Sequence, residues 1–154
     1  MKKIVLLVTA IFAILAFSTQ NSNAQSKKKS AAEWKKILTA DQYEIMVNRG
    51  TEQPYKNAYY NNHEKGVYVS AATGDVLFTS DDKYDSHTGW PSFVKPADAS
   101  KIAIVQDNSL GMTRDEVIEK STGLHLGHVF DDGPADRGGK RFCMNSGALK
   151  FIKK

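Results

Sequence analysis

The only cysteine of the chain, Cys143, lies in the run Arg141-Phe142-Cys143-Met144-Asn145. If this run is a β-strand, side-chain alternation places Arg141, Cys143 and Asn145 on one face and Phe142 and Met144 on the other. A guanidinium beside a thiol lowers the pKa of the thiol and so favours the nucleophilic thiolate. The spacing therefore indicates a nucleophile, although a lone cysteine can also be an inert core residue.

Two histidines and a tryptophan lie elsewhere in the sequence. His125 and His128 are three residues apart, so in a regular strand they point to opposite faces, one exposed and one in the core. They can serve one site only if the strand bulges, which Gly127 between them permits. Trp90 precedes Pro91 in a restricted turn, where it can form the wall of a pocket or cap the core.

A thiol with neighbouring histidines supports three chemistries. The first is acyl transfer, with the thiolate as nucleophile and a histidine as base. The second is metal binding by His125, His128 and Cys143. The third is thiol redox chemistry, with a histidine as proton donor. Spacing alone leaves all three open.

Two short helices are expected before a β-rich region. Ser30 and Glu33 have capping-box spacing and predict a helix with Trp34, Ile37 and Leu38 on its inner face. Thr39 begins a second capping box and a second helix. Short strands are then expected at 66–69, 76–78, 101–106, 111–119, 124–130, 141–145 and 148–152. This order predicts a mainly β domain, formed by a curved antiparallel sheet or a small barrel after the helices.

The first 24 residues are expected to be a signal peptide. Lys2 and Lys3 precede an apolar run over 4–17, and Ser22-Asn23-Ala24 supplies a small-x-small cleavage site. The apolar run is short for a membrane span, so an uncleaved anchor is the weaker alternative. Cleavage would lower the formal net charge from +4 by two, and most of the remaining excess lies in terminal lysines. We therefore expect no nucleic-acid partner.

Three motifs in order identify a family. Gly89-Trp90-Pro91-Ser92-Phe93, the run 125–134 beginning His125-Leu126-Gly127-His128, and Arg141-Phe142-Cys143-Met144-Asn145-Ser146 closely resemble the peptide-methionine (R)-S-oxide reductases. The similarity extends from about Leu38 to Ile152. It implies two antiparallel sheets packed as a tent with N-terminal helices. Together with the signal peptide expected over 1–24, the resemblance divides the chain into a linker and the start of the helical region over 25–37 and a reductase domain over 38–154.

The resemblance also implies a mechanism. The Cys143 thiolate would attack the sulfur of methionine sulfoxide, a histidine would protonate the oxygen, and Cys143 would become a sulfenic acid. Trp90 and Phe130 would bind the substrate side chain. The polar groups expected to bind the sulfoxide oxygen or activate the cysteine are His125, His128, Asn145 and Arg141. A relative that binds oxidised methionine without turnover is the alternative within this family.

The chain departs from the family at two places. Many members bind a structural zinc through two Cys-x-x-Cys pairs, but the matching positions here are Ser70, Thr73, Glu119 and Thr122. Because one carboxylate cannot hold a four-coordinate ion, we expect no zinc and no other cofactor. Thr88 stands where a resolving cysteine is common, so the sulfenic acid requires an external thiol, thioredoxin-like or other.

The expected protein is thus an exported, periplasmic or secreted monomer that acts on oxidised methionine in peptides or proteins. The resemblance does not explain one residue, His87. His87 occupies a place that glycine often holds in the family, and the sequence assigns it no role.

Overall fold

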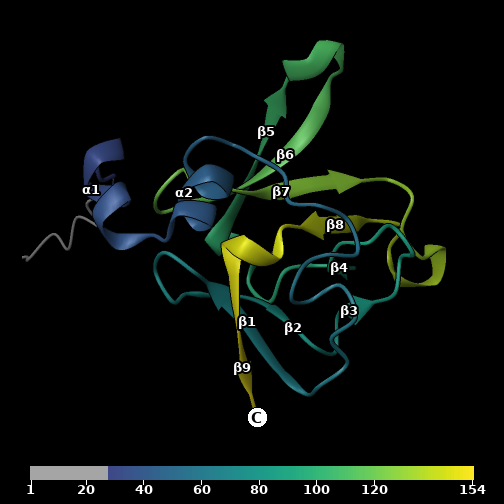
Figure 1. Cartoon of the computed structure of the whole chain (residues 1–154). Coiled ribbons are helices and arrows are strands. Elements are labelled where there is room, and N and C mark those ends of the chain that lie inside the picture. Colours follow the sequence, from purple (N-terminus) through teal and green to yellow (C-terminus); the bar gives the residue numbers. More distant parts are fainter. Residues whose placement is uncertain (1–27) are drawn as a thin grey trace, which may run out of the picture.

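The computed structural model describes residues 28–154. The expected signal peptide 1–24 and the first residues of the expected linker lie outside the described residues. Within 28–154, no helix has both the length and the apolar character that crossing a membrane requires. The chain runs through two short helices and then through the strands of two sheets (Figure 1).

Both helices begin at the predicted capping boxes. Helix α1 (Ala31–Ile37) is capped by Ser30, whose side chain accepts from the Glu33 amide while the Glu33 carboxylate accepts from Ser30. Helix α2 (Ala40–Met46) is capped by Thr39 in the same way. Trp34 and Leu38 are buried as predicted, but Ile37 is 52% exposed. The inner face of α1 is therefore narrower than the sequence pattern indicates, because the seven-residue helix packs along one edge only.

All strand pairs are antiparallel and form two separate sheets. The smaller sheet has the order β2 (Val76–Thr79), β1 (Gly66–Ser70) and β9 (Leu149–Lys153). The larger sheet has the order β3 (Lys83–Tyr84), β4 (Ser92–Phe93), β8 (Arg141–Met144), β7 (His125–Phe130), β6 (Arg114–Glu119) and β5 (Ile102–Asp107). Both described sheets are open, so the tent arrangement is confirmed and the alternative of a closed small barrel is wrong.

Two parts of the sheet prediction need correction. Ser92 and Phe93 belong to strand β4 rather than to a loop, and β4 pairs with β8. The strand expected from Gly111 begins only at Arg114, because Ser109–Gly111 form a 3-10 turn in which Leu110 has a φ of 56°. The first difference arises from a pairing partner far along the chain, which local residue preferences do not reveal. The second arises from the local turn that closes the hairpin of β5 and β6.

Aromatic side chains join the two sheets. Phe78 of β2 stacks on Phe93 of β4 with ring centroids 4.4 Å apart, and Tyr68 of β1 meets the same ring at 5.0 Å. Phe142 of β8 lies 6.1 Å from Phe78. These rings are buried in one core, so the inward face of β8 is held by the smaller sheet while its other face is available for a site.

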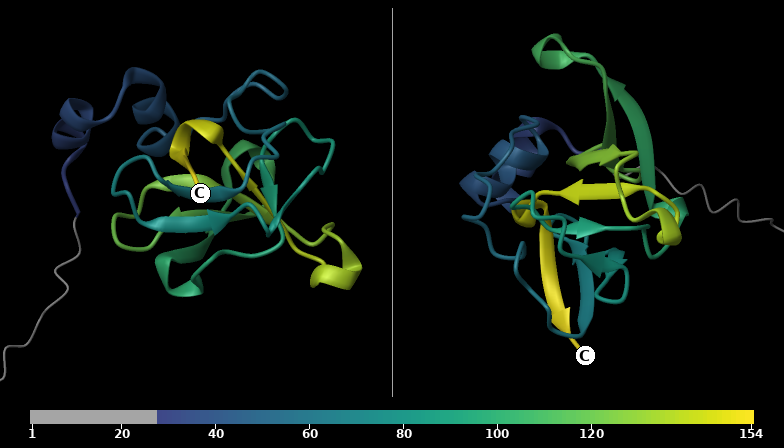
Figure 2. Two further views of the ribbon diagram at one scale, coloured as in Figure 1. Left: turned by 90° about the horizontal axis from the view of Figure 1, so that it is seen from below. Right: turned by 90° about the vertical axis from the view of Figure 1, so that its right-hand side faces the viewer.

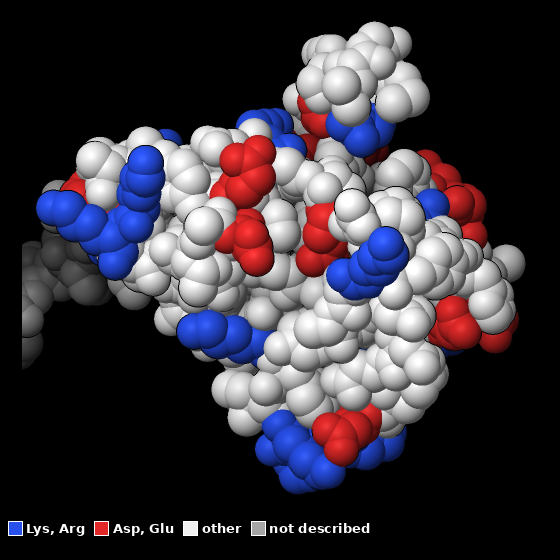
Figure 3. All heavy atoms as spheres, in the orientation of Figure 1, with Lys and Arg blue, Asp and Glu red and all other residues white. Residues whose placement is uncertain are grey.

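The hairpin of β5 and β6 projects from the body of the domain. Its tip and the C-terminal end of β9 lie at opposite ends of the molecule (Figures 1 and 2). On the face shown in Figure 3, Lys and Arg are interspersed with Asp and Glu.

Candidate active site

Strand β8 places Cys143 between two neighbouring strands of the larger sheet. Cys143 is opposite His128 on β7 and opposite Ser92 on β4. Phe142 and Met144 are buried in the core, so the predicted alternation of side chains along this strand is confirmed. The thiol is partly buried, on the face that the core leaves free.

A bulge in β7 brings the two histidines together. Val117 of β6 pairs with Gly127, whereas the next residue, Ile118, pairs with His125, so Leu126 is the extra residue. The His125 and His128 rings are consequently 5.3 Å apart. The predicted bulge is confirmed, and it needs glycine, because a Cβ at position 127 would lie 2.2 Å from the Cys143 carbonyl oxygen.

Each histidine is held by a carboxylate from the β5–β6 hairpin. His125 Nδ1 is 2.6 Å from Glu116 Oε1, and His128 Nε2 is 2.8 Å from Asp107 Oδ2. Arg49 pairs with Glu116 in turn. The sequence analysis did not identify these two carboxylates. The only signal for them was the alternation of side chains along the two strands of the hairpin. They orient both imidazoles toward the cysteine strand.

Burial controls the charge of the inner histidine. It lowers the pKa of His125 to about 4, and the neighbouring His128 acts in the same direction. His125 is therefore neutral at pH 7, and an Nδ1–H donated to Glu116 leaves Nε2 as an acceptor facing the Asn145 amide at 3.5 Å. Burial also raises the pKa of Glu116. Hydrogen bonds from Ser109 and His128 hold the pKa of Asp107 well below its usual range.

Opposing effects act on the cysteine. Burial raises the pKa of the Cys143 thiol, while Arg141, Thr88 and Ser92 act in the opposite direction. Arg141 thus has the expected sign, but burial outweighs it. Its guanidinium is also committed to Asp132, through two bonds of 2.8 and 2.9 Å. The net effect of these surroundings is therefore to raise the pKa of the thiol rather than to lower it.

A cavity of about 120 Å³ opens beside the thiol. It is lined by Thr51, Trp90, Arg114, Gly127, His128, Phe130, Cys143, Met144 and Asn145. The predicted cysteine, asparagine and aromatic residues thus meet at one cavity, together with His128. His125 and Arg141 are absent from this wall and act from behind it, through Asn145 and through the Phe130 ring, which lies 4.4 Å from the Arg141 guanidinium.

Arg114 has an unexpected setting in the cavity wall. Arg114 bonds Asp107 at 2.8 Å, yet its Nε is buried and has no hydrogen-bond partner among residues 28–154. Sequence reasoning missed this residue. A buried, unpaired donor in a cavity wall is available to a ligand oxygen.

Glu52 fixes the positions of Trp90 and Asn145. Its carbonyl oxygen accepts from Trp90 Nε1 at 3.1 Å, and its backbone N–H donates to Asn145 Oδ1 at 3.2 Å. Its partly buried carboxylate accepts from the backbone N–H groups of Ser146 and Gly147. Glu52 therefore links Trp90 on one side of the cavity to Asn145 on the other. The sequence analysis did not indicate this role.

The four positions of the family's zinc site carry a hydrogen-bond network instead. The carboxylate of Glu119, which is fully buried, accepts from the hydroxyls of Thr73 and Thr122. Ser70 accepts from the backbone amides of Ala72 and Thr73. One carboxylate and three hydroxyls do not fit zinc, which takes thiolate and imidazole ligands. Throughout the described chain, no three His, Cys, Asp or Glu side chains are placed to share a metal ion, His125, His128 and Cys143 included.

Comparisons with known proteins agree with this geometry. Residues 38–153 match the SelR domain family. The chain is 49% identical over 124 residues to the peptide methionine sulfoxide reductase MsrB of Methanosarcina barkeri, an alignment that covers 80% of this chain and 87% of that protein. It is 52% identical over 117 residues to the peptide methionine sulfoxide reductase MsrA/MsrB of Vibrio cholerae, covering 76% of this chain and 31% of that longer protein. The chain therefore belongs to the SelR domain family of MsrB-type peptide methionine sulfoxide reductases.

Proposed function

We propose that the protein reduces the R epimer of methionine sulfoxide in peptides or proteins, using Cys143 as nucleophile and an external thiol as reductant. The observation that carries this proposal is the convergence of Cys143, His128, Asn145, Trp90 and Phe130 on one small cavity. Family membership supports the class of reaction, and the arrangement of the residues that line the cavity supports the role proposed for each of them.

The first half-reaction balances without an added proton. The Cys143 sulfur attacks the sulfoxide sulfur, the S–O bond of the substrate breaks, and the oxygen ends on Cys143 as a sulfenic acid. Methionine leaves, reduced by two electrons. Because the thiol proton ends on the transferred oxygen, the raised pKa of Cys143 is compatible with this step. Proton transfer through a neighbouring base accelerates such reactions.

His128 is the side chain best placed to move that proton. It lines the cavity opposite Cys143 in the strand register, and Asp107 engages its Nε2. His125 does not line the cavity and is neutral at pH 7, so it acts as a positioning residue that holds Asn145. The spare Nε–H of Arg114 then provides a donor for the sulfoxide oxygen. The Asn145 amide, which donates to the Leu126 carbonyl at 3.2 Å and faces His125 Nε2, shapes the wall beside it.

The opposite wall is aromatic and suits the methyl group of the substrate. Trp90 is fixed by its bond to Glu52, and Phe130 by its stack on Arg141. A sulfoxide sulfur is pyramidal and carries three different groups. Only one epimer can place its oxygen on the polar wall and its methyl on the aromatic wall while the side chain leads out of the cavity. This separation of walls supports selection of one epimer.

The proposal also covers the setting of the reaction. The chain has no second cysteine, so another molecule must reduce the sulfenic acid. The charged start, apolar run and cleavage site over 1–24 support export to the periplasm or the medium, where oxidised exported proteins would be the substrates. The saturated network around Glu119 supports a zinc-free protein, and we expect it to act as a monomer.

A peptide that contains methionine-R-sulfoxide tests the function directly. With dithiothreitol as reductant, wild type should form methionine in multiple turnovers, and Cys143→Ser should form none above background. The matched peptide with the S epimer is the control and should remain oxidised. Equal rates for wild type and Cys143→Ser would refute the proposal. Tight binding of the R epimer without a sulfenic acid on Cys143 would instead favour a binding module.

Export requires its own test. The full chain should yield a mature protein that begins near Gln25, recovered outside the cytoplasm and identified by N-terminal sequencing. Recovery of the unprocessed chain in the cytoplasm would contradict the export assignment without affecting the proposed reaction.

A further inference from the structure

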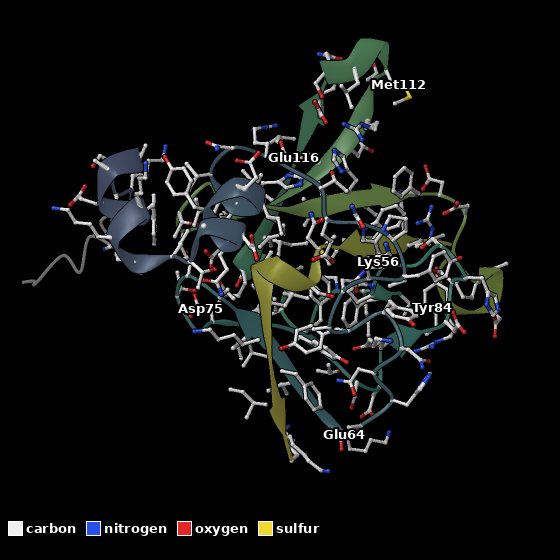
Figure 4. The ribbon with its side chains drawn as sticks, viewed as in Figure 1. Lys56, Glu64, Asp75, Tyr84, Met112 and Glu116 are labelled. Atoms are coloured by element: carbon white, nitrogen blue, oxygen red, sulfur yellow. The ribbon has the colours of Figure 1, made fainter. Side chains whose placement is uncertain are left out.

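The tip of the hairpin formed by β5 and β6 carries the one exposed methionine of the described chain. Met112 is 53% exposed, whereas Met46 and Met144 are each 1% exposed. Every residue from 108 to 113 is exposed. In Figure 4, Met112 lies at the end of the projecting hairpin, while Glu116 lies near its base. A small oxidant in solution therefore reaches the Met112 thioether more readily than the thioethers of the two buried methionines.

Local hydrogen bonds hold this tip in a fixed shape. The Asp107 carboxylate accepts from the Ser109 amide at 2.9 Å and from the Arg114 guanidinium at 2.8 Å. The Thr113 hydroxyl donates to the Asn108 side chain at 3.0 Å. The pairing of β5 with β6 continues without a break up to the base of the tip. Because the tip projects and is braced in this way, its methionine stays outside the cavity of its own chain, whose lining does not include it.

The backbone around Met112 suits insertion into a cavity of another molecule. Met112 itself is extended, with a φ of −126° and a ψ of 152°. Its neighbour Gly111 has no side chain, and the space where a Cβ would stand is empty for 4 Å around. A methionine side chain is long, unbranched and flexible. Its sulfur can therefore extend beyond the tip without any unfolding of the hairpin.

The composition of the tip matches the cavity beside Cys143. Among the described residues that line this cavity, Arg114 is the only Lys, Arg, Asp or Glu, and one side of the cavity is aromatic. The segment 108–113 contains no charged residue, so its entry buries no additional charge. Leu110, which is 79% exposed, adds an apolar side chain two residues from Met112. The tip of one chain is thus chemically suited to the cavity of an identical chain.

We propose that Met112 is a reversible oxidation site and that a second copy of this chain reduces it. Hydrogen peroxide transfers one oxygen atom to the Met112 sulfur and leaves as water. In the second copy the Cys143 sulfur takes this oxygen, and Met112 returns to the thioether. Two external thiols then convert the sulfenic acid into the Cys143 thiol, with release of water and a disulfide.

The complete cycle balances. One hydrogen peroxide and two thiols become two molecules of water and one disulfide, and both protein chains end as they began. The inference rests on the proposed function, because it names this chain as a substrate of that same reaction. The encounter between the two copies is transient, since it lasts only while the oxygen atom is transferred.

The test uses one variant as substrate and another as catalyst. The substrate is Cys143→Ser, treated with hydrogen peroxide and then freed of it. The catalyst is Met112→Leu, which keeps Cys143 and has no thioether at the tip. Dithiothreitol is the reductant, and mass spectrometry of the peptide that contains Met112 measures its sulfoxide. The double variant Cys143→Ser/Met112→Leu is the matched control catalyst, and an R-sulfoxide peptide measures the activity of each catalyst.

Peroxide should oxidise Met112 and leave Met46 and Met144 unoxidised. Chemical oxidation forms both sulfoxide epimers, so the Met112→Leu catalyst should remove about half of the Met112 sulfoxide, at a rate proportional to its concentration. The double variant should remove none. Met112→Leu should also match wild type on the R-sulfoxide peptide, because the tip lies outside the cavity of its own chain.

Two results would overturn the inference. The first is a Met112 that peroxide leaves unoxidised, and the second is a Met112 sulfoxide that persists while the same catalyst reduces the R-sulfoxide peptide. Failure of wild type on that peptide would instead refute the proposed function, so the two failures are distinguishable. In oxidised wild type, the rate of repair per molecule should fall in proportion to dilution. A rate independent of dilution would overturn the role of the second copy.

Discussion

The buried network around Glu119 is expected to stabilise the fold as a metal clasp would. Its carboxylate links the turn after β1, through Thr73, to the turn after β6, through Thr122. Removing it in Glu119→Ala loses two hydrogen bonds to a fully buried charged group. At roughly 1.5–3 kcal/mol for each such bond, the free energy of unfolding should fall by about 3–6 kcal/mol.

Urea unfolding, followed by tryptophan fluorescence, measures this change. Thr73→Val removes one of the two bonds and should cost about 2 kcal/mol. The double variant should cost less than the sum of the single variants, because the Thr73 bond is already lost in Glu119→Ala. Glu64→Ala is the matched control. Its carboxylate is 54% exposed and pairs with Lys153, so its loss should cost less than about 1 kcal/mol.

Two results would refute this reasoning. A loss below about 1 kcal/mol for Glu119→Ala would show that the bonds contribute no more than surface pairs do. A fall in the melting temperature of wild type after treatment with a chelator would show that a metal, rather than the network, holds the two turns together. The second result would also overturn the zinc-free expectation.

Three further outcomes are expected. The low pKa of His125, about 4 in the folded protein against roughly 6.5 unfolded, contributes stability that is present above the unfolded value and lost as pH falls through the folded value. The difference in the free energy of unfolding between wild type and His125→Gln, measured in urea titrations, should therefore shrink as the pH is lowered between those two values. A constant difference would contradict burial as the cause of the low pKa. Arg114→Lys keeps the charge but loses the spare Nε–H, so KM for the R-sulfoxide peptide should rise about fivefold with the fold intact, and an unchanged KM would remove Arg114 from substrate binding. Arg141→Ala should raise the pKa of Cys143 in alkylation-rate titrations, whereas an unchanged titration would show that Asp132 fully occupies this guanidinium.

Much of the architecture was predictable because its signals are local. The capping boxes at Ser30 and Thr39 and the alternation in the Cys143 strand depend on residues a few positions apart. The bulge between His125 and His128 was predictable only on the condition that both histidines serve one site, because residues three apart share a face of a strand only if the strand bulges. The short strand β4 was not, because a two-residue strand exists only through its pairing with β8.

The sequence by itself determined the family and the residues of the three motifs, and it predicted the reacting group, because these are matters of residue type and order. It also predicted that an external thiol completes the reaction, since Cys143 is the only cysteine. The tertiary structure alone decided which groups act at the cavity and which act from behind it. Glu116, Asp107, Arg114 and Glu52 reach the site from distant positions, and their effects depend on distance and burial, which a linear pattern does not encode. The structure likewise decided the direction in which the pKa of the Cys143 thiol moves, because burial outweighs the neighbouring guanidinium.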